Sequence, residues 1–270
     1  MASLTDLDLS VNILIGPIPQ QMSKLQGLQN LNLSFNPLNL YSPPSWLGSM
    51  NSLFQLGLAD TGIVGPLPAW LASTSISTLD MSSNKLVGQL PAWIGNMTSL
   101  SFLNLSNNCL DSKIPEEFKN LTTLTDVDLH SNKFTGPIRP VLAKKTSDPQ
   151  GHYNSIDLSR NQFTDGIDQD IGSLPAMDSL TAFDVSYNPL GGMIPASIRS
   201  LANLAAVRMA GDGLTGGIPA GLLNLGSLTV FDVSRNKLTG MIPPHTANLG
   251  ASGFRGNAGL CGSPLPPCKQ

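Results

Sequence analysis

Acidic side chains recur at one position of this sequence, between two apolar residues. Leu7-Asp8-Leu9 and Phe231-Asp232-Val233 show the pattern, and such alternation predicts a short strand with apolar side chains inward and polar ones outward. Six of the ten residues at the outward position are Asp, so they could form an acidic stripe that attracts a basic ligand and steers its association. The ten positions are Asp8, Asn32, Gly57, Asp80, Asn104, Asp128, Asp157, Asp184, Arg208 and Asp232.

A second interpretation of this stripe is structural. In Leu-Asp-Leu-Ser the neighbouring Ser and Asn residues could hold the carboxylate, so that Asp would belong to a repeat consensus and not to a ligand site. We favour this interpretation for the stripe as a whole, and Arg208 is more informative because it interrupts the acidic series. The stripe residues retained as ligand-binding candidates are Asp80, Asp128, Asp157, Asp184, Arg208 and Asp232.

The next outward positions carry less regular residues. Arg and Tyr are favoured as binding anchors, so these positions are our choice for a ligand surface on the concave face. Singly exposed aromatic side chains are common in proteins, and each one alone is a weak indication. The residues are Phe35, Asn107, His130, Arg160, Tyr187 and Arg235.

Signs of catalysis and of metal binding are missing from the sequence. His130, His152 and His245 lie in different segments without metal-ligand spacing, and there is no G-x-S-x-G, H-E-x-x-H or P-loop pattern. Cys109 has no partner nearby in the sequence and is interpreted as an isolated thiol. We therefore predict a protein that is not an enzyme and that needs neither a metal nor a cofactor.

A repeat must position these side chains. The motif L-x-L-x-x-N recurs at intervals of 23 to 29 residues, which lies in the range of leucine-rich repeats. The sequence thus predicts a leucine-rich-repeat solenoid of about ten 24-residue repeats, with a parallel concave β-sheet and short 3-10 or helical convex segments. The last residue of the motif can hydrogen-bond backbone groups left unpaired by the turn. It is Asn12, Asn36, Thr61, Asn84, Asn108, Asn132, Asn161, Asn188, Asp212 or Asn236, and Thr61 and Asp212 can do so only partly.

Composition agrees with a chain of many turns and excludes some partners. The chain has 26 Gly and 21 Pro with only 12% charged residues, which is too much turn chemistry for a helical protein. Its net charge is −3, so there is no basic surface for a nucleic acid. No apolar run is long enough to span a membrane, and residues 1–14 lack the pattern of a secretion signal.

Beyond the ladder residue, most repeats read N-x-L-x-G-x-I-P, as in residues 12–19, 188–195 and 236–243. Over residues 1–268 the chain resembles the plant-specific leucine-rich-repeat family of receptor-like kinases, receptor-like proteins and polygalacturonase-inhibiting proteins. The resemblance implies a second short strand at G-x-I-P and a twisted, extracellular solenoid that binds ligands on its concave or lateral face.

Some repeats depart from this pattern, and the second strand is doubtful there. Two repeats are longer than the others, so we expect loops to bulge from the convex or lateral side at Arg139–Asn154 and Asp168–Thr181. The departing residues are Leu40 and Ser42 beside Pro43, Ser112 in place of a Gly, and Asp165 with Asp168 in place of Gly and Pro.

The two ends of the chain differ. Residues 254–268 resemble the family's C-terminal cap, F-x-G-N-x-G-L-C-G-x-P-L-x-x-C, which implies a disulfide between Cys261 and Cys268, with free thiols as the alternative. A structural disulfide indicates an oxidising, extracellular environment. At the other end the chain enters a full repeat at Leu4 without a polar cap. We therefore expect a solenoid over residues 1–250 whose N-terminal cap and signal peptide were lost by truncation, and a cap over residues 251–270.

Four sequons of the form N-x-S/T are present. Asn96 and Asn120 lie at turns that lead into the sheet and are plausible glycosylation sites. Asn32 and Asn104 lie on the predicted strands, where a glycan would cover the concave face, and we expect crowding to keep them bare.

Two functions are compatible with these observations. The first is a secreted recognition scaffold that binds a protein, a peptide or a glycan in the plant cell wall, for example an inhibitor of a microbial polygalacturonase in defence. The second is the truncated ectodomain of a receptor-like kinase or receptor-like protein in ligand-dependent signalling. The sequence that follows residue 270 in the full transcript would separate them, since an apolar 20-residue segment there indicates a receptor.

Overall fold

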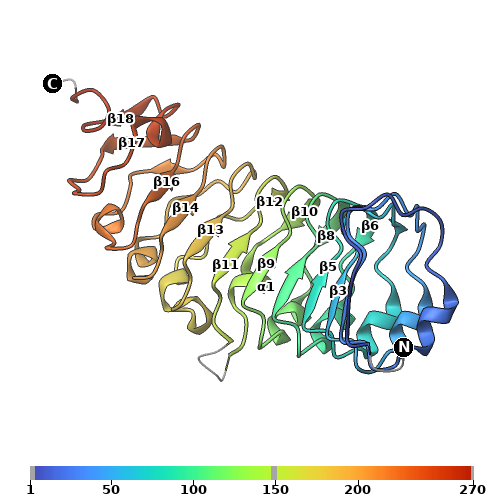
Figure 1. The fold of residues 1–270 in the computed structure, drawn as a ribbon. Helices are drawn as coiled ribbons and strands as arrows, with labels where there is room; N and C mark the ends of the chain where they lie inside the picture. The colour runs from blue at the N-terminus through green and yellow to red at the C-terminus, as the bar shows by residue number, and fades with distance from the viewer. Residues whose placement is uncertain (1–3, 147–150, 269–270) are drawn as a thin grey trace.

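The computed structural model describes residues 4–146 and 151–268, which form an extended stack of coils (Figure 1). Each coil contributes one three-residue strand to a parallel sheet, and in the described residues this sheet has ten strands in chain order. The predicted leucine-rich-repeat solenoid is confirmed. The strands are β1 (Asp6–Asp8), β2 (Asn30–Asn32), β3 (Gln55–Gly57), β5 (Thr78–Asp80), β7 (Phe102–Asn104), β9 (Asp126–Asp128), β11 (Ser155–Asp157), β13 (Ala182–Asp184), β14 (Ala206–Arg208) and β16 (Val230–Asp232).

Every pair of neighbouring strands in this sheet has the same register. Asp128 of β9 pairs with Asp157 of β11, which pairs in turn with Asp184 of β13. The central residue of nearly every strand is buried and the two flanking residues face outward, as alternation along a strand requires. Equivalent outward residues therefore line up in columns across the concave surface, one strand spacing apart.

The ladder asparagines hold each turn and join it to the preceding repeat. The Nδ2 group of Asn108 donates to the carbonyl oxygens of Leu105 and Ser106 in its own repeat and of Met81 in the previous one, at 3.0, 3.1 and 3.0 Å. Its Oδ1 atom accepts the backbone N–H of Leu86 at 2.9 Å. Asn257 in the C-terminal segment makes three of these four kinds of bond, without the one to the residue two positions earlier, although its shorter spacing kept it out of the predicted ladder.

A second set of strands follows the ladder turns. A five-stranded parallel sheet and a three-stranded one lie along this side of the solenoid in the described residues. The first contains β4 (Val64–Gly65), β6 (Lys85–Gln89), β8 (Cys109–Lys113), β10 (Lys133–Gly136) and β12 (Gln162–Phe163), and the second contains β15 (Thr215–Gly216), β17 (Lys237–Met241) and β18 (Gly259–Cys261).

Among the irregular repeats, one lacks the second strand as expected and another forms it. No second strand forms around Leu40 and Ser42. At Ser112 the expectation was wrong, and the second strand forms as β8. Ser112 itself adopts the left-handed conformation, with φ of 68°, that a glycine provides in other repeats. Asp165 also takes a positive φ, of 70°, but β12 has already ended at Phe163.

Short 3-10 helices form the convex side, opposite the sheet (Figure 1). An extended proline precedes many of them, for example Pro91 and Pro115, because a φ near −65° suits the residue before the first turn. They are η1 (Gln20–Lys24), η2 (Ser45–Ser49), η3 (Ala69–Ser73), η4 (Ala92–Asn96), η5 (Glu116–Asn120), η7 (Ile171–Ser173), η8 (Pro175–Met177), η9 (Ala196–Ser200), η10 (Leu222–Asn224) and η11 (Ala251–Phe254).

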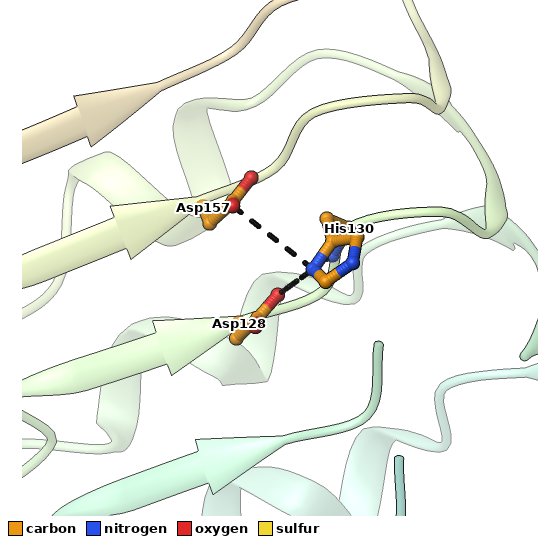
Figure 2. A group of neighbouring side chains, drawn as sticks. All are labelled: Asp128, His130 and Asp157. Atoms are coloured by element: carbon orange, nitrogen blue, oxygen red, sulfur yellow. Dashed lines mark hydrogen bonds and ion pairs between the residues drawn. The ribbon is translucent and has the colours of Figure 1, made fainter. Parts of the chain in front are cut away.

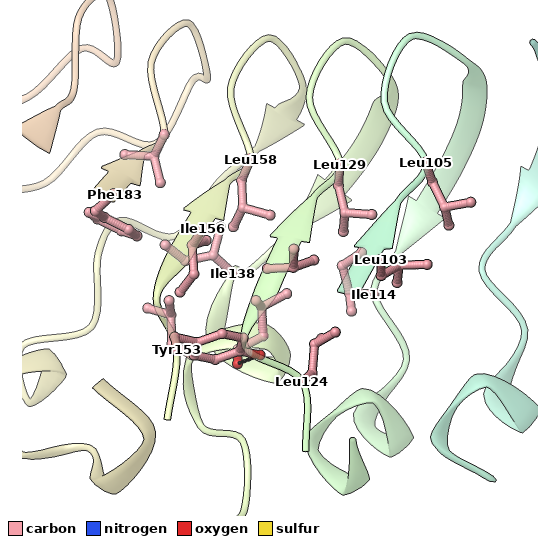
Figure 3. Packing of buried hydrophobic residues seen from close by; sticks show 14 of the residues in the cluster. Leu103, Leu105, Ile114, Leu124, Leu129, Ile138, Tyr153, Ile156, Leu158 and Phe183 are labelled. Carbon is pink, nitrogen blue, oxygen red and sulfur yellow. Dashed lines mark hydrogen bonds between the residues drawn. The ribbon is translucent and has the colours of Figure 1, made fainter. Parts of the chain in front are cut away.

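One continuous apolar core lies between the sheet and the convex helices. Figure 3 shows its regular build, in which Leu103, Leu105, Leu129, Ile156 and Leu158 point from successive strands into the same layer. Each repeat thus buries its apolar side chains only against its neighbours, which is how a solenoid of small units becomes stable.

The two long repeats carry short helices on the convex side. The first contains α1 (Arg139–Leu142), which packs beside η5, and the second contains η7 and η8. The guanidinium of Arg139 joins the two repeats through ion pairs with Asp168 and Asp170, at 2.6 and 2.9 Å. Residues 147–150 of the first expected loop lie outside the described part of the chain.

The first long repeat also buries a lysine. The ammonium group of Lys144 donates to the carbonyl oxygens of Leu124 and Gly151 and lies 4.3 Å from the ring centre of Tyr153. Burial lowers the pKa of Lys144 to about 8. Its aliphatic stem and its cation together replace part of the apolar packing that a regular repeat would supply.

The C-terminal segment closes the exposed end of the core. The backbone N–H of Val233 in the last repeat donates to the carbonyl of Gly253, and the ring of Phe254 lies 5.6 Å from that of Phe231. The predicted disulfide between Cys261 and Cys268 is present. We retain the division into a solenoid over residues 1–250 and a cap over residues 251–270 as a proposal.

Asp212 is the ladder residue with an unpartnered buried oxygen. It replaces an Asn at a fully buried position, where Oδ1 accepts the backbone N–H of Asn188 at 2.9 Å and Oδ2 has no hydrogen-bond partner. Burial raises the pKa of Asp212 from 3.8 to about 8, and the nearby Asp184 carboxylate adds to the shift. The native protein therefore holds a proton on Asp212 that the unfolded chain releases above about pH 4.

We predict that the free energy of unfolding falls as pH rises between 3.8 and about 8, because the unfolded state loses its proton before the native state does. Asp212→Asn restores the amide donor and should remove most of this slope. It should also stabilise the chain by about 1–3 kcal/mol at the upper end of that range. Urea unfolding at a series of pH values measures both effects, with the partly exposed Asp232→Asn as control. An unchanged slope in Asp212→Asn would contradict the assignment.

Candidate ligand-binding surface

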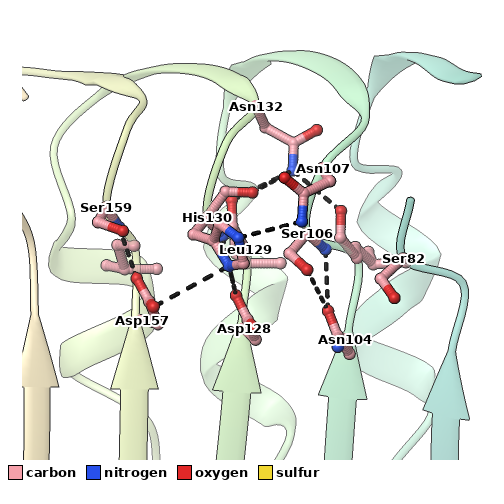
Figure 4. A network of polar contacts seen from close by, with 12 residues as sticks. Ser82, Asn104, Ser106, Asn107, Asp128, Leu129, His130, Asn132, Asp157 and Ser159 are labelled. Atoms are coloured by element: carbon pink, nitrogen blue, oxygen red, sulfur yellow. Dashed lines mark hydrogen bonds and ion pairs between the residues drawn. The ribbon is translucent and has the colours of Figure 1, made fainter. Parts of the chain in front are cut away.

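The Asp stripe lies on the concave surface as predicted from the strand pattern, and the turn holds most of its carboxylates. The Oδ1 atoms of Asp80, Asp157, Asp184 and Asp232 each accept the backbone N–H of the residue two positions later, at 2.9 Å. Figure 4 shows the same arrangement at Asn104 and Asp157. This contact accounts for Asp in the repeat pattern and still leaves the second carboxylate oxygen for other partners.

The residue before each ladder Asn occupies a left-handed turn on the same surface. Phe35, Arg160, Tyr187 and Arg235 have φ between 54° and 61°, and all four side chains are exposed. The guanidinium carbon of Arg160 lies 4.9 Å from the ring centre of Tyr187, so these two candidates form one cation–π pair. This column thus places Arg and aromatic side chains next to the Asp stripe.

A hollow of about 480 Å³ lies over the first five strands of the sheet, β1 to β7. Gly57 of the stripe lies on its floor, and the side-chain oxygens of Asn32 and Ser34 lie close to this glycine. The carboxylates of Asp6, Asp8 and Asp80 line it together with the apolar side chains of Val11 and Phe35. The hollow therefore offers negative charge beside an apolar wall, which suits a lysine or arginine side chain.

Sequence reasoning missed part of this hollow. The residue that precedes the central apolar residue of each strand also faces the concave side, and Asp6, Gln55, Thr78 and Phe102 line the hollow from this column. The period of two along a strand could have indicated them, since both neighbours of an inward residue point outward.

Two acidic side chains of the hollow, those of Asp6 and Asp8, stay charged in mildly acidic solution. Hydrogen bonds from the side chains of Thr5 and Asn30 hold the pKa of Asp6 below its ordinary value. Hydrogen bonds from Ser10 do the same for Asp8. Both carboxylates are therefore available to a cationic ligand in mildly acidic solution.

His130 contacts two residues of the Asp stripe (Figure 2). Its Nδ1 atom lies 2.6 Å from Oδ1 of Asp128 and 4.0 Å from Oδ2 of Asp157, and its Nε2 atom lies 3.1 Å from the amide nitrogen of Asn107. The sequence did not predict this cluster, because Asp157 belongs to the next repeat. The prediction of no metal-ligand spacing counted residues along the chain, whereas the cluster forms across strands.

The Asp stripe becomes less negative toward the C-terminus. Burial raises the pKa of Asp184 above its ordinary value, and the adjacent Asp157 carboxylate adds to the shift. Arg208 lies in register between Asp184 and Asp232, so its cation compensates part of their charge. Arg208 and Arg235 are thus placed on the concave side, but they lie several strands away from the hollow.

The four sequons differ in their surroundings. Asn96 is exposed at the end of η4, and Asn120 is partly exposed at the end of η5, both on the convex side. Asn32 and Asn104 lie on the concave strands, where each Oδ1 atom accepts the backbone N–H of the following Ser34 or Ser106. A glycan on either strand residue would have to displace these contacts.

Known proteins share both the repeats and the fold. The leucine-rich-repeat family models match residues 74–134 and, as single repeats, residues 27–50, 179–201 and 227–249. Receptor-like protein 31 of Arabidopsis thaliana is 39% identical over 77 residues, which are 28% of this chain and 9% of that protein. These matches show leucine-rich repeats in this chain and a similarity of part of it to a plant receptor-like protein.

Solved receptor ectodomains superpose on nearly the whole solenoid. A TDR receptor matches with a TM-score of 0.76 and 28% identity, over 89% of this chain and 40% of that one. PEPR1 in complex with AtPEP1 gives 0.75 and 29%, over 96% and 39%. The Arabidopsis HAESA ectodomain with an extended IDA peptide hormone gives 0.76 and 25%, over 98% and 51%. The chain therefore spans between 39% and 51% of the length of these three structures. None of the helices in the described residues is long and apolar enough to cross a membrane.

We predict that the chain, produced through a plant secretory pathway, carries glycans at Asn96 and Asn120 and none at Asn32 and Asn104. The convex sequons reach solvent at helix ends, whereas the strand sequons have engaged side chains on a crowded sheet. Glycopeptide mass spectrometry measures the occupancy of each site. Asn104→Gln serves as control, because it should leave the glycan mass unchanged. A glycan on Asn104 would contradict the prediction.

Proposed function

We propose that this chain is the ligand-binding part of an extracellular, receptor-like plant protein and that it recognises a peptide on its concave surface without catalysing a reaction. One observation carries the proposal, namely the acidic, partly apolar hollow over Gly57 on a continuous ten-stranded sheet. A relative supports it, since the receptor kinase HAESA was solved as an ectodomain in complex with an IDA peptide hormone.

The ligand is a peptide with a basic side chain. An arginine or lysine in the hollow could pair with Asp8 while its aliphatic stem lies against Phe35 and Val11, and a second basic side chain could pair with Asp80, three strands away. Charge of this kind on a concave surface raises the rate of association and makes it depend on salt. The Arg160–Tyr187 pair, four to five strands farther along, is positioned to contact a later part of an extended peptide.

Receptor function is favoured over the inhibitor function that the sequence also allowed. Among the similar proteins, the TDR structure is that of a receptor, the HAESA structure is that of a receptor kinase ectodomain, and the Arabidopsis relative is a receptor-like protein. Binding of a wall glycan and inhibition of a microbial polygalacturonase stay predictions of the sequence, and an inhibition assay with a fungal polygalacturonase tests the second of them.

We predict that basic peptides, selected from a displayed random library at mildly acidic pH, bind the chain in the hollow. The double variant Asp8→Asn with Asp80→Asn should weaken their binding at least tenfold, because about 1.4 kcal/mol of charge attraction is enough for that change. Binding should also weaken as salt concentration rises. Isothermal titration calorimetry measures the affinities.

Asp232→Asn is the matched control, because this residue belongs to the same stripe but lies at the other end of the sheet. Equal affinity of the wild type and the double variant for every selected peptide would exclude the hollow as the binding site.

A further inference from the structure

We propose that Asp128, His130 and Asp157 form a binding site for a divalent transition-metal ion of the Zn²⁺ class on the concave surface. The three residues come from two neighbouring repeats and meet at the ends of β9 and β11 (Figure 2). The site is separate from the hollow over Gly57, and it does not depend on the proposed peptide ligand.

The distances suit a small ion. One ligand atom from each residue, Nδ1 of His130 and a carboxylate oxygen of each Asp, lie within 4.8 Å of one another. Two ligands that are each about 2.1 Å from a tetrahedral zinc ion are separated by roughly 3.4 Å. The present separations from Nδ1 are 2.6 Å to Asp128 and 4.0 Å to Asp157, so side-chain shifts of about 1 Å bring all three atoms around one ion.

The fold holds the two carboxylates in place. Asp128 and Asp157 are paired in register on adjacent parallel strands. Oδ1 of Asp157 accepts the backbone N–H of Ser159, and this contact directs Oδ2 toward the imidazole ring. Oδ1 of Asp128 likewise accepts the backbone N–H of His130 at 3.0 Å. The carboxylates therefore converge because of the turn itself, before any ion binds.

Asn107 can orient the imidazole from outside the cluster. Its side-chain amide lies 3.1 Å from Nε2 of His130, in the repeat before the histidine (Figure 4). When Nδ1 binds a metal, Nε2 carries the proton, and the amide oxygen of Asn107 accepts it after a half-turn of the amide group. Such an outer partner commonly fixes a metal-bound histidine.

The donor set decides the class of ion. One imidazole nitrogen with two carboxylates favours zinc and its neighbours, whereas Ca²⁺ and Mg²⁺ prefer oxygen ligands alone. The side chains of His130, Asp128 and Asp157 are 27%, 29% and 34% exposed, so a further coordination position faces the open concave surface. Solvent or a ligand group can occupy that position.

The charge of the surroundings also favours a cation. Asp128, Asp157 and Asp184 lie in register on three successive strands, and Arg208 borders this series only at its far end. Other repeats place a serine where His130 stands, as at Ser106, Ser159 and Ser186. The histidine is therefore not needed to complete the turn.

Isothermal titration calorimetry of the full chain with ZnCl₂ at neutral pH tests the proposal. We expect one saturable ion per chain and much weaker binding of Ca²⁺ and Mg²⁺. His130→Ser should abolish the saturable phase. This variant installs the residue of the neighbouring repeats and should fold normally. The double variant Asp128→Asn with Asp157→Asn should abolish the saturable phase as well. Asn107→Ala should weaken it by about tenfold.

Three control variants remove other metal-binding side chains. Cys109→Ser, His245→Gln and Asp232→Asn should leave the affinity for Zn²⁺ unchanged, because these residues lie outside the cluster. Thermal unfolding monitored by circular dichroism confirms that each variant is folded. No saturable binding by the wild type, or binding that survives in His130→Ser, would overturn the assignment. The assay contains no peptide, so its outcome is independent of that of the peptide experiment.

Discussion

The hydrogen bonds of the ladder asparagines are the constraint on which the rest of this structure depends. A three-residue strand has too few backbone bonds to fix its own position, and the chain must reverse direction directly after it. The amide of each ladder Asn donates to carbonyl groups of two repeats and accepts a backbone N–H of the preceding repeat, as Asn108 and Asn132 show. Turn and stacking are therefore specified by the same side chain.

This constraint explains why the concave surface is ordered enough to bind a ligand. Because each ladder residue sets the offset between repeats, the ten strands share one register, and the outward residues stand in straight columns. A change of one residue type in a column then has a local geometric effect. Gly57 lines a hollow, His130 lies against two carboxylates, and Arg208 interrupts the acidic series. The ligand specificity of such a surface therefore depends on the positions at which a residue differs from the repeat pattern.

The irregular repeats show how much deviation the ladder tolerates. Ser112 takes a backbone conformation usually left to glycine, and Lys144 replaces apolar packing with a buried cation held by carbonyl groups. Oδ1 of Asp212 accepts a backbone N–H as the ladder asparagines do, but Asp212 has no amide group that donates to the carbonyl oxygens, and its Oδ2 atom has no partner. In each case the neighbouring repeats hold the segment in place, since their packing continues on both sides.

The sequence by itself determined the repeat, the inward and outward faces of each strand, the ladder and the paired cysteines, because these follow from local periodicity and from the resemblance of the last segment to a known cap. The tertiary structure alone decided which outward residues meet. His130 and Asp157 are far apart along the chain and become neighbours only through the register of β9 and β11. The hollow likewise needs five strands at once, and the second strand at Ser112 forms by pairing with the neighbouring repeats. Contacts of this kind depend on the offset between repeats and on which carboxylate oxygen the turn engages, and neither is written in the spacing of residues along one strand.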